Sequence, residues 1–232
     1  MSTPLWGALI ALASYLLGAV PFGLLLARLK GVDIRKVGSG NIGATNVLRS
    51  IGKPWGIATF ACDALKGFVP AAFFPIVGNH FGADFQSLEV WGVVCAVAAI
   101  LGHNFPIYLG FKGGKGVATS AGALLGLAPL AVVIGLSIWA VFFFTLRYVS
   151  LASIVAAASV VVSAWVLYRS GSLLLPVVLT VLGSLVIARH HANIRRLLNG
   201  TESRFERKKK AEVRGQKSEG RGQKAEGRGG GA

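Results

Sequence analysis

Apolar residues gather in long runs along most of this chain, and short polar stretches separate them. Five clear runs cover about residues 5–27, 54–77, 89–108, 151–168 and 173–188. Each is close to the roughly 20 residues that an α-helix needs to cross a hydrocarbon core about 30 Å thick. The pattern predicts an all-α, polytopic membrane protein.

A sixth apolar stretch, residues 117–146, is long for a single helix. Pro129 interrupts it shortly after Gly126, and a proline inside a helix breaks or sharply kinks it. A split at Pro129 gives seven spans and an unbroken helix gives six. The two alternatives place the C-terminus on opposite sides of the membrane.

The distribution of Lys and Arg favours seven spans. With a split at Pro129, one set of loops holds nearly all the basic residues, while Arg169 is the only one in the opposite loops. The basic side holds Arg28, Lys30, Arg35, Lys36, Arg49, Lys53, Lys112, Lys115, Arg147 and the C-terminal segment. Cytoplasmic loops carry an excess of Lys and Arg, so we expect seven transmembrane helices, an external N-terminus and a cytoplasmic C-terminus.

The C-terminal segment differs from the rest in composition. Of the 232 residues 53% are hydrophobic and 14% charged, yet ten of the 24 Lys and Arg follow Glu202. That segment repeats RGQKSEG as RGQKAEG from residue 214 and is almost free of apolar residues. We predict a transmembrane domain, residues 1–202, and a basic disordered tail, residues 203–232. The tail is either a solvated extension or an arm for anionic lipid headgroups or nucleic acid.

The first polar cluster runs from Ser39 to Arg49 and lies in a loop predicted to be cytoplasmic. Its glycines let backbone approach a ligand closely, and the Arg49 guanidinium suits phosphate. Gly43 also precedes an expected helix start, where free N–H groups favour an anion. The alternative is a polar connecting loop with a helix cap. The candidate substrate-binding residues here are Ser39, Gly40, Asn41, Gly43, Thr45, Asn46 and Arg49.

The second cluster combines Gly102-His-Asn-Phe-Pro106 with Phe111-Lys-Gly-Gly-Lys-Gly-Val-Ala-Thr119. Lysines alternating with glycines suit a phosphate cradle of backbone N–H groups and ammonium charge. No Ser or Thr follows Gly114-Lys115 directly, and the flanks are apolar spans, so this is no nucleotide P-loop. Lysines that snorkel at the membrane boundary are the alternative. The candidates are Lys112, Gly113, Gly114, Lys115 and Gly116.

The third cluster runs from Arg189 to Glu202, where the last span is expected to continue as a helix into the cytoplasm. His190 and Asn193 are three residues apart and would share one face of that helix. Asn199-Gly200 would end it. Arg195 and Arg196 could simply mark the membrane boundary and contact lipid headgroups.

Acidic and metal-binding chemistry is sparse. Outside the tail the acidic residues are Asp33, Asp63, Asp84, Glu89 and Glu202, and no close pair suggests acid–base work by two carboxylates. No His, Cys and carboxylate group has metal-ligand spacing, and Cys62 and Cys95 are interpreted as packing residues. We therefore expect no metal and no cofactor.

Taken in order, the three clusters resemble those of the bacterial acyl-phosphate-dependent glycerol-3-phosphate acyltransferases of the inner membrane. The resemblance covers about residues 1–202 and leaves out the tail. It implies a seven-helix membrane fold with an active site on the cytoplasmic face. It also implies acyl transfer from acyl phosphate to the 1-hydroxyl of glycerol 3-phosphate, giving lysophosphatidic acid and phosphate.

The resemblance also suggests roles for residues. It implies that Ser39, Arg49 and a lysine of the second cluster hold phosphate, and we choose Lys115 over Lys112. His190 and Asn193 correspond to the pair at the glycerol end, and Glu202 joins the substrate-binding set. The hydroxyl proton passes either to His190 or to a substrate phosphate.

Two other classes of protein compete with this interpretation. A transporter for phosphate or a phosphoester would need charged residues near the bilayer midplane, where Asp63 and Lys66, three apart, are the only candidates. A membrane-anchored nucleic-acid binder would use the tail but leave the three clusters without a role, and Phe205 is the tail's one aromatic residue. We expect membrane lipids as neighbours and no nucleic acid as partner.

Overall fold

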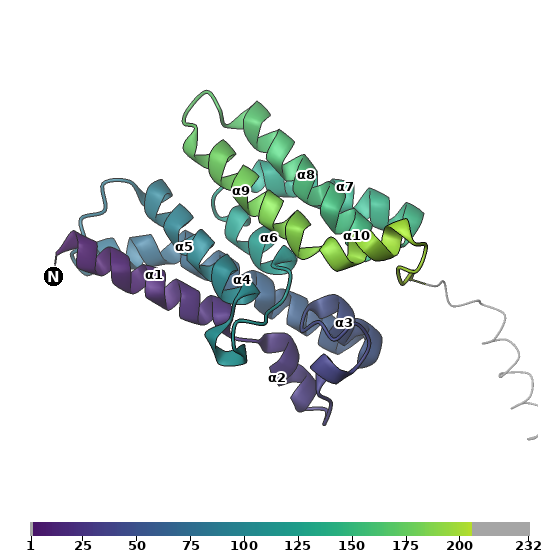
Figure 1. Cartoon of the computed structure of the whole chain (residues 1–232). Helices are drawn as coiled ribbons and strands as arrows, with labels where there is room; N and C mark the ends of the chain where they lie inside the picture. Colours follow the sequence, from purple (N-terminus) through teal and green to yellow (C-terminus); the bar gives the residue numbers. More distant parts are fainter. Residues whose placement is uncertain (1, 206–232) are drawn as a thin grey trace, which may run out of the picture. The chain divides into compact units, whose positions relative to one another are not determined.

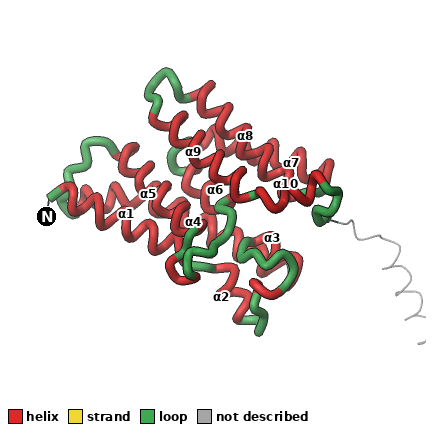
Figure 2. Tube along the Cα trace, viewed as in Figure 1, coloured by secondary structure: helices red, strands yellow, loops and turns green. Residues whose placement is uncertain are grey.

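The computed structural model describes residues 2–205, and the predicted tail therefore lies almost wholly outside the described residues. Residues Met1–Glu202 group into one compact unit. Throughout the described part the regular elements are helices, as Figures 1 and 2 show. They are α1 (Thr3–Ala19), α2 (Phe22–Arg28), η1 (Ile34–Lys36), α3 (Ala44–Ser50), α4 (Lys53–His80), α5 (Leu88–Asn104), η2 (Ile107–Leu109), α6 (Val117–Leu125), α7 (Pro129–Leu146), α8 (Val149–Leu167), α9 (Leu174–Arg189) and α10 (His191–Leu198).

The helices confirm an all-α, multi-pass membrane protein. Within the described residues five helical segments are long and apolar enough to span a membrane, and the bent pair α9–α10 makes a sixth candidate. The predicted break near Pro129 is present, because α6 ends at Leu125 and α7 begins at Pro129. Helix α6 has only nine residues, about 13 Å at 1.5 Å per residue, which is shorter than a hydrocarbon core.

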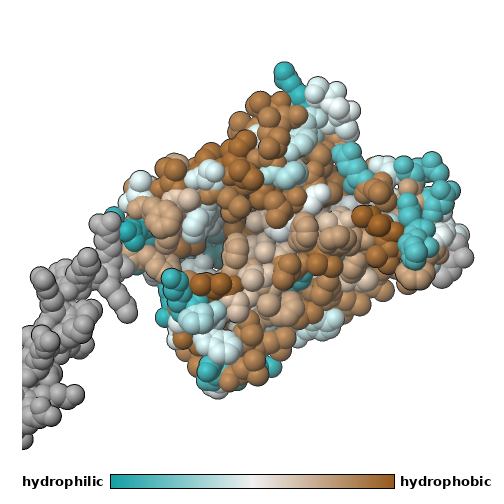
Figure 3. Space-filling model, turned by 180° about the vertical axis from the view of Figure 1, so that it is seen from behind, coloured by the Kyte–Doolittle hydropathy of each residue, from teal (hydrophilic) through white to brown (hydrophobic). Residues whose placement is uncertain are grey.

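The outer surface is apolar between two polar ends. Figure 3 shows hydrophobic residues covering the middle of the molecule and hydrophilic residues gathered toward its ends. Large apolar side chains such as Leu12, Phe144 and Val166 are 55%, 66% and 71% exposed. Such exposure over a broad band suits contact with lipid tails, which solvate apolar side chains as well as a protein core does.

Glycines allow two helix pairs to approach closely. A methyl group on Gly18 of α1 would overlap the backbone of α5 at Ala99, and one on Gly122 of α6 would overlap α4 at Ala64. Gly67 of α4 meets α6 in the same way. Small residues at helix contacts are a common means of packing in membranes. They hold α5 against α1 and α6 against α4, and the second cluster lies between α5 and α6.

The first predicted span is present as one candidate membrane segment, Thr3–Arg28, but its helix is interrupted. Helix α1 ends at Ala19 and α2 begins at Phe22, because Pro21 lacks the N–H that would continue the hydrogen-bond ladder. Lys66 Nζ donates to the Val20 carbonyl at this break, at 2.8 Å. The same ammonium lies 2.8 Å from Asp63 Oδ1, so Asp63 and Lys66 form an ion pair within α4.

The predicted single helix through the third cluster is wrong. Helices α9 and α10 meet at His190 with a bend of 55°. His190 therefore stands at the corner and precedes the face that carries Asn193, rather than sharing a straight helix with it. The predicted end at Asn199-Gly200 is confirmed, because α10 ends at Leu198 and Gly200 has a φ of +68°.

Candidate active site

Asn46 organises the first loop from within. Its buried Nδ2 donates to the carbonyls of Ile34, Val37 and Asn41 at 2.9–3.1 Å. Its Oδ1 accepts from the backbone N–H of Ser39 at 3.0 Å. One amide thus fixes both ends of the loop between η1 and α3. These contacts explain Asn46 as a residue that shapes the loop, and its predicted contact with substrate stays a prediction.

The loop also has the backbone conformation that its glycines allow. Gly38 and Gly40 have φ values of +59° and +69°, a left-handed region that other residues rarely adopt. Asn41 Oδ1 accepts from the Gly43 N–H at 2.8 Å. Helix α3 begins directly afterwards, so the predicted helix start after Gly43 is confirmed. Arg49 lies on α3, one turn after Asn46.

The second loop leads into the N-terminus of α6. Gly116 has a φ of +80° and precedes the helix, and no side chain caps its first turn. The first N–H groups of a helix have no intrahelical acceptor, so they are available to an anion. Arg189 of α9 holds this loop, donating to the carbonyls of Gly113 and Gly114 at 2.8–3.1 Å. The loop carbonyls are thereby turned toward Arg189.

The second and third clusters meet through a network of polar side chains. Lys115 Nζ donates to Asn193 Oδ1 at 2.6 Å, and Asn193 Nδ2 donates to Glu202 Oε1 at 2.7 Å. Glu202 also accepts from Ser150 Oγ at 2.6 Å and from Arg196 Nε at 2.7 Å. Residues separated by 78 positions in sequence are therefore in direct contact.

Burial, neighbouring charges and hydrogen bonds shift the pKa values of two side chains in this network. Burial lowers the pKa of Lys115 to about 8; Glu202 opposes this shift, while Arg196, Arg189 and Arg49 add to it. Burial alone would raise the pKa of Glu202, but hydrogen bonds from Ser150, Asn193 and Arg196 hold it below its usual value. Glu202 is thus a fixed anion, and Lys115 is a cation that gains from a further negative charge nearby.

His190 is buried at the corner between α9 and α10, with 2% of its surface exposed. Its Nδ1 lies 2.8 Å from the carbonyl of Val186. A carbonyl only accepts hydrogen bonds, so Nδ1 carries the proton and Nε2 keeps a lone pair. Nε2 is therefore suited to accept a hydrogen bond from a hydroxyl group.

The structure brings some predicted residues together and leaves others apart. Lys115, Asn193 and Glu202 are in contact, and Arg49 is close enough to Glu202 for their charges to interact. His190 interacts electrostatically with Lys115 and Glu202. The exposed residues Ser39, Gly40 and Lys112 lie on the first and second loops, and the partly exposed Thr45 lies in the first turn of α3; within the described residues none of them forms a hydrogen bond or ion pair with this group.

Three contributors were missed by sequence reasoning. Arg189 is part of the third cluster, but no role is assigned to it from the sequence. Its position next to His190 was the one local indication that it could belong to the site. Arg196 was interpreted as a boundary residue, although it binds Glu202. Ser150 follows an apolar run without any local signal, so only the fold reveals its bond to Glu202.

An apolar groove adjoins the site. Helices α6, α7, α8 and α9 line it with residues that include Val117, Trp139, Ala157, Leu179 and Val186. Val117 follows Gly116 of the second loop, and the Val186 carbonyl binds His190. The groove therefore begins beside the polar network and runs along the helices away from it.

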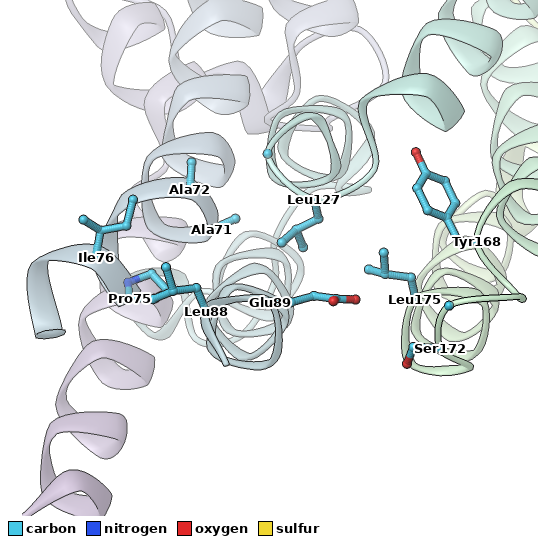
Figure 4. A pocket seen from close by; sticks show the side chains of 12 residues that line it. Ala71, Ala72, Pro75, Ile76, Leu88, Glu89, Leu127, Tyr168, Ser172 and Leu175 are labelled. Atoms are coloured by element: carbon cyan, nitrogen blue, oxygen red, sulfur yellow. The ribbon is translucent and has the colours of Figure 1, made fainter. Parts of the chain in front are cut away.

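A second cavity, of about 540 Å³, lies between α4, the start of α5, the C-terminal ends of α6 and α8, and the start of α9. Figure 4 shows Glu89 extending between Leu127 and Leu175, with Tyr168 nearby. No Lys or Arg is among the residues that line it. A phosphate therefore has no cationic partner there, and the polar network is the better candidate for phosphate chemistry.

Comparison with known proteins decides the family. Residues 8–200 match the family described as glycerol-3-phosphate acyltransferase. The chain belongs to this family. It is 46% identical over 201 residues to the glycerol-3-phosphate acyltransferase of Geotalea daltonii, covering 85% of this chain and 97% of that one. It is 44% identical to that of Aquifex aeolicus, covering 84% and 97%.

Solved structures of the family have the same fold. The chain is similar to the glycerol 3-phosphate form of PlsY, an integral membrane glycerol 3-phosphate acyltransferase, with a TM-score of 0.76 and 42% identity. The match covers 86% of this chain and 96% of that one. The lysophosphatidic acid form of PlsY gives a TM-score of 0.73 and 41% identity. The expected family and an integral membrane, helical fold are thus confirmed.

Proposed function

We propose that this chain transfers a fatty acyl group from acyl phosphate to the 1-hydroxyl of glycerol 3-phosphate, giving lysophosphatidic acid and phosphate. The observation that carries this proposal is the meeting of Lys115, Asn193 and Glu202 beside an apolar groove, in a chain of the glycerol-3-phosphate acyltransferase family. A phosphate site next to a lipid-like groove suits one water-soluble and one fatty substrate.

Lys115 and Arg49 are the proposed partners of the glycerol 3-phosphate phosphate group. Burial lowers the pKa of Lys115, which means that its charge is incompletely satisfied in the protein alone. A phosphate dianion would supply the missing partner. Charge-assisted hydrogen bonds of this kind contribute about 1.5–3 kcal/mol each. Ser39, on the first loop, is proposed as a further partner of this phosphate.

The apolar groove is the proposed binding site of the acyl chain. Its mouth lies beside Gly116 and the N-terminus of α6, where free N–H groups can bind the phosphate of the donor. The chain would then lie between α6, α7, α8 and α9, with the reacting carbonyl at the mouth. This places both substrates around the corner at His190.

The reaction needs little acid–base equipment. The glycerol oxygen attacks the acyl carbon, the bond between that carbon and the bridging phosphate oxygen breaks, and phosphate leaves. Because acyl phosphate is a mixed anhydride with a good leaving group, alignment of the two substrates does most of the work. Alignment supplies about 7–11 kcal/mol in favourable cases, and fixed donors at the developing oxyanion add about 3–4 kcal/mol.

His190 and Asn193 are proposed to orient the attacking hydroxyl. The proton on Nδ1 is fixed by Val186, so Nε2 can accept the hydroxyl hydrogen bond. Burial disfavours a charged imidazolium in this position. The departing or bound phosphate is therefore the proposed acceptor of the proton, and His190 is a positioning group for the hydroxyl.

The finer topology belongs to the same proposal. Seven spans, with α6 as the short one, an external N-terminus and a cytoplasmic C-terminus, place all three clusters on the cytoplasmic face of a bacterial inner membrane. The distribution of Lys and Arg supports this orientation. A division into a catalytic unit, residues 1–202, and a basic tail, residues 203–232, completes the proposal.

The transporter alternative is weakened by the state of Asp63 and Lys66. Each is 3% exposed; they form an ion pair, and Lys66 also donates to the Val20 carbonyl at the break after α1. Because these two charges neutralise each other and bind the backbone at the helix break, they are not available to bind a transported anion within the membrane.

One assay tests the proposal directly. Purified full-length protein is given labelled glycerol 3-phosphate with acyl phosphate, acyl-CoA or acyl carrier protein carrying the same acyl chain. We expect lysophosphatidic acid and equimolar phosphate with acyl phosphate alone. Product from acyl-CoA at an equal rate would show that the donor is wrong. Export of glycerol 3-phosphate from vesicles without acyl transfer would favour a transporter.

A further inference from the structure

A buried polar cluster lies beneath the second loop and has no part in the chemistry proposed above. Asp63 and Lys66 of α4 and His103 of α5 are each at most 4% exposed. His103 Nδ1 lies 3.7 Å from the same Asp63 oxygen that binds Lys66. Ionisable groups buried within membrane spans are costly to keep and commonly serve a function.

His103 touches the second loop at two points. Its carbonyl accepts a hydrogen bond from the Gly114 N–H at 3.1 Å. A methyl group on Gly114 would overlap the ring nitrogen Nε2, so the imidazole lies directly against that glycine. Asn104 is fully buried and stands in the same way under Gly116, where an added Cβ would come within 2.9 Å of Asn104 Oδ1. His103 and Asn104 thus form a floor under the loop.

Asp63 faces the ring that forms this floor. At 3.7 Å the carboxylate is too far from Nδ1 for a direct hydrogen bond, but its negative charge favours a proton on the nitrogen that faces it. Nε2 occupies the space that a side chain on Gly114 would need, so the ring and the loop backbone are packed against each other. The charge of Asp63 is balanced by Lys66, so the ring need not be protonated.

We propose that Asp63 and His103 are positioning residues that hold the Gly113–Gly116 loop where Lys115 can bind a substrate phosphate. The proposal rests on the function proposed above, since it assigns the loop to phosphate binding. Lys115 directly follows Gly114, so a shift of Gly114 would draw Lys115 away from Asn193. The pair acts on the phosphate through the loop and touches no substrate.

The first test removes the carboxylate without leaving an unpaired buried charge. The double variant Asp63→Asn/Lys66→Met replaces both charges by groups of similar size. We expect the KM for glycerol 3-phosphate to rise roughly tenfold or more, with kcat within about threefold, because ground-state phosphate binding is lost. Asn79→Ala, which removes a polar contact to Phe85 at the other end of α4, should leave KM unchanged. A folded double variant with the KM of the wild type would overturn the proposal.

The second test uses the contact between His103 and Gly114 and does not require the first variant to fold. Gly114→Ala should lower kcat/KM for glycerol 3-phosphate by roughly a hundredfold in the wild type, because the methyl group displaces the loop from the ring. In a His103→Ala background the methyl group has room, so the further loss should be about threefold or less. Equal losses in both backgrounds would show that His103 does not position the loop.

A binding measurement separates this inference from the proposed function. Calorimetry with glycerol 3-phosphate, in the absence of any acyl donor, gives a dissociation constant for each variant. If the wild type binds glycerol 3-phosphate but acyl phosphate gives no product, the proposed donor is wrong and a weaker dissociation constant in Asp63→Asn/Lys66→Met still supports the positioning pair. If the wild type binds no glycerol 3-phosphate, the proposed function and this inference both fail.

Discussion

At the scale of single residues, the site contains one charged group that titrates near neutral pH, and its other charged groups do not. Glu202 is held as an anion by three donors, one of which is the Arg196 guanidinium. Lys115 differs, because its pKa is lowered to about 8. Its charge is therefore the one in the network that changes near physiological pH.

The charge of Lys115 gives the enzyme an alkaline limit. Since its pKa is lowered from 10.5 to about 8, the protonated form is lost as pH rises through 8 instead of above 10. We expect kcat/KM for glycerol 3-phosphate to fall across that interval, because the free enzyme loses its phosphate partner. Initial rates between about pH 6.5 and 9.5 measure the change.

Arginine variants provide the control for this limit. Lys115→Arg should move the decline beyond about pH 9, because a guanidinium stays protonated, although a different geometry lowers the overall rate. Lys112→Arg, in the same loop but exposed, should leave the decline where it is. An unchanged decline in Lys115→Arg would assign the limit to another group.

His190 gives a second prediction at this scale. His190→Gln keeps a hydrogen-bonding side chain but cannot act as a base near neutral pH. If His190 orients the hydroxyl, the variant should keep measurable acyl transfer, whereas loss of an obligatory base costs about 10²–10⁴-fold. The assay compares kcat in His190→Gln and Asn193→Ala at fixed acyl phosphate. A folded His190→Gln protein without activity, beside an active Asn193→Ala, would make His190 the base.

At the scale of the elements, breaks between helices position the chemistry. Pro21 ends α1 early, Pro129 separates α6 from α7, and the corner at His190 turns α10 away from α9. The short α6 begins at the glycine loop and lines the apolar groove with its other residues. One helix therefore contributes its N-terminus to the polar site and its side to the groove.

The groove predicts a change in acyl-chain preference. Ala157→Phe would place a large ring among the groove residues, so donors with long chains should lose activity more than donors with short ones, by roughly tenfold or more. The ratio of kcat/KM for acyl phosphates of 16 and about 8 carbons measures this. Val166→Phe lies on the same helix, at a side chain 71% exposed to the surroundings, and should leave the ratio unchanged. Equal ratios in Ala157→Phe and the wild type would show that the acyl chain does not bind in the groove.

At the scale of the whole molecule, the polar network and the 540 Å³ cavity mark opposite ends of one helical bundle. The first end collects Lys and Arg, and the second is nearly free of them. A membrane between the two ends would match the apolar band in Figure 3. The distribution of Lys and Arg between the two ends then predicts which end faces the cytoplasm.

The proposed orientation can be checked in intact cells. In a background without Cys62 and Cys95, we expect Arg147→Cys to resist a membrane-impermeant thiol reagent and Arg169→Cys to react, because positive loops stay cytoplasmic. Labelling after permeabilisation shows that both positions are accessible. External labelling at position 147 would restore six spans and place the C-terminus outside.

The sequence by itself determined the membrane class, the three clusters and their order. Apolar runs of about 20 residues suffice for spans, since each such helix satisfies its own backbone in lipid. The break at Pro129 and the helix start after Gly43 also follow from local rules, because proline and glycine act on their own backbone. The same reasoning missed the break at Pro21, where the apolar run continues without interruption.

Only the tertiary structure decided which polar groups act together. The contacts of Lys115 with Asn193, Glu202 with Ser150, and His103 with Gly114 join different elements and depend on how closely the helices approach. Glycines such as Gly67 and Gly122 set that approach through contacts that no local pattern encodes. Likewise, the corner at His190 was invisible in a continuous helical pattern. Local sequence fixes the backbone state of a residue, whereas its partners and burial depend on packing between distant segments.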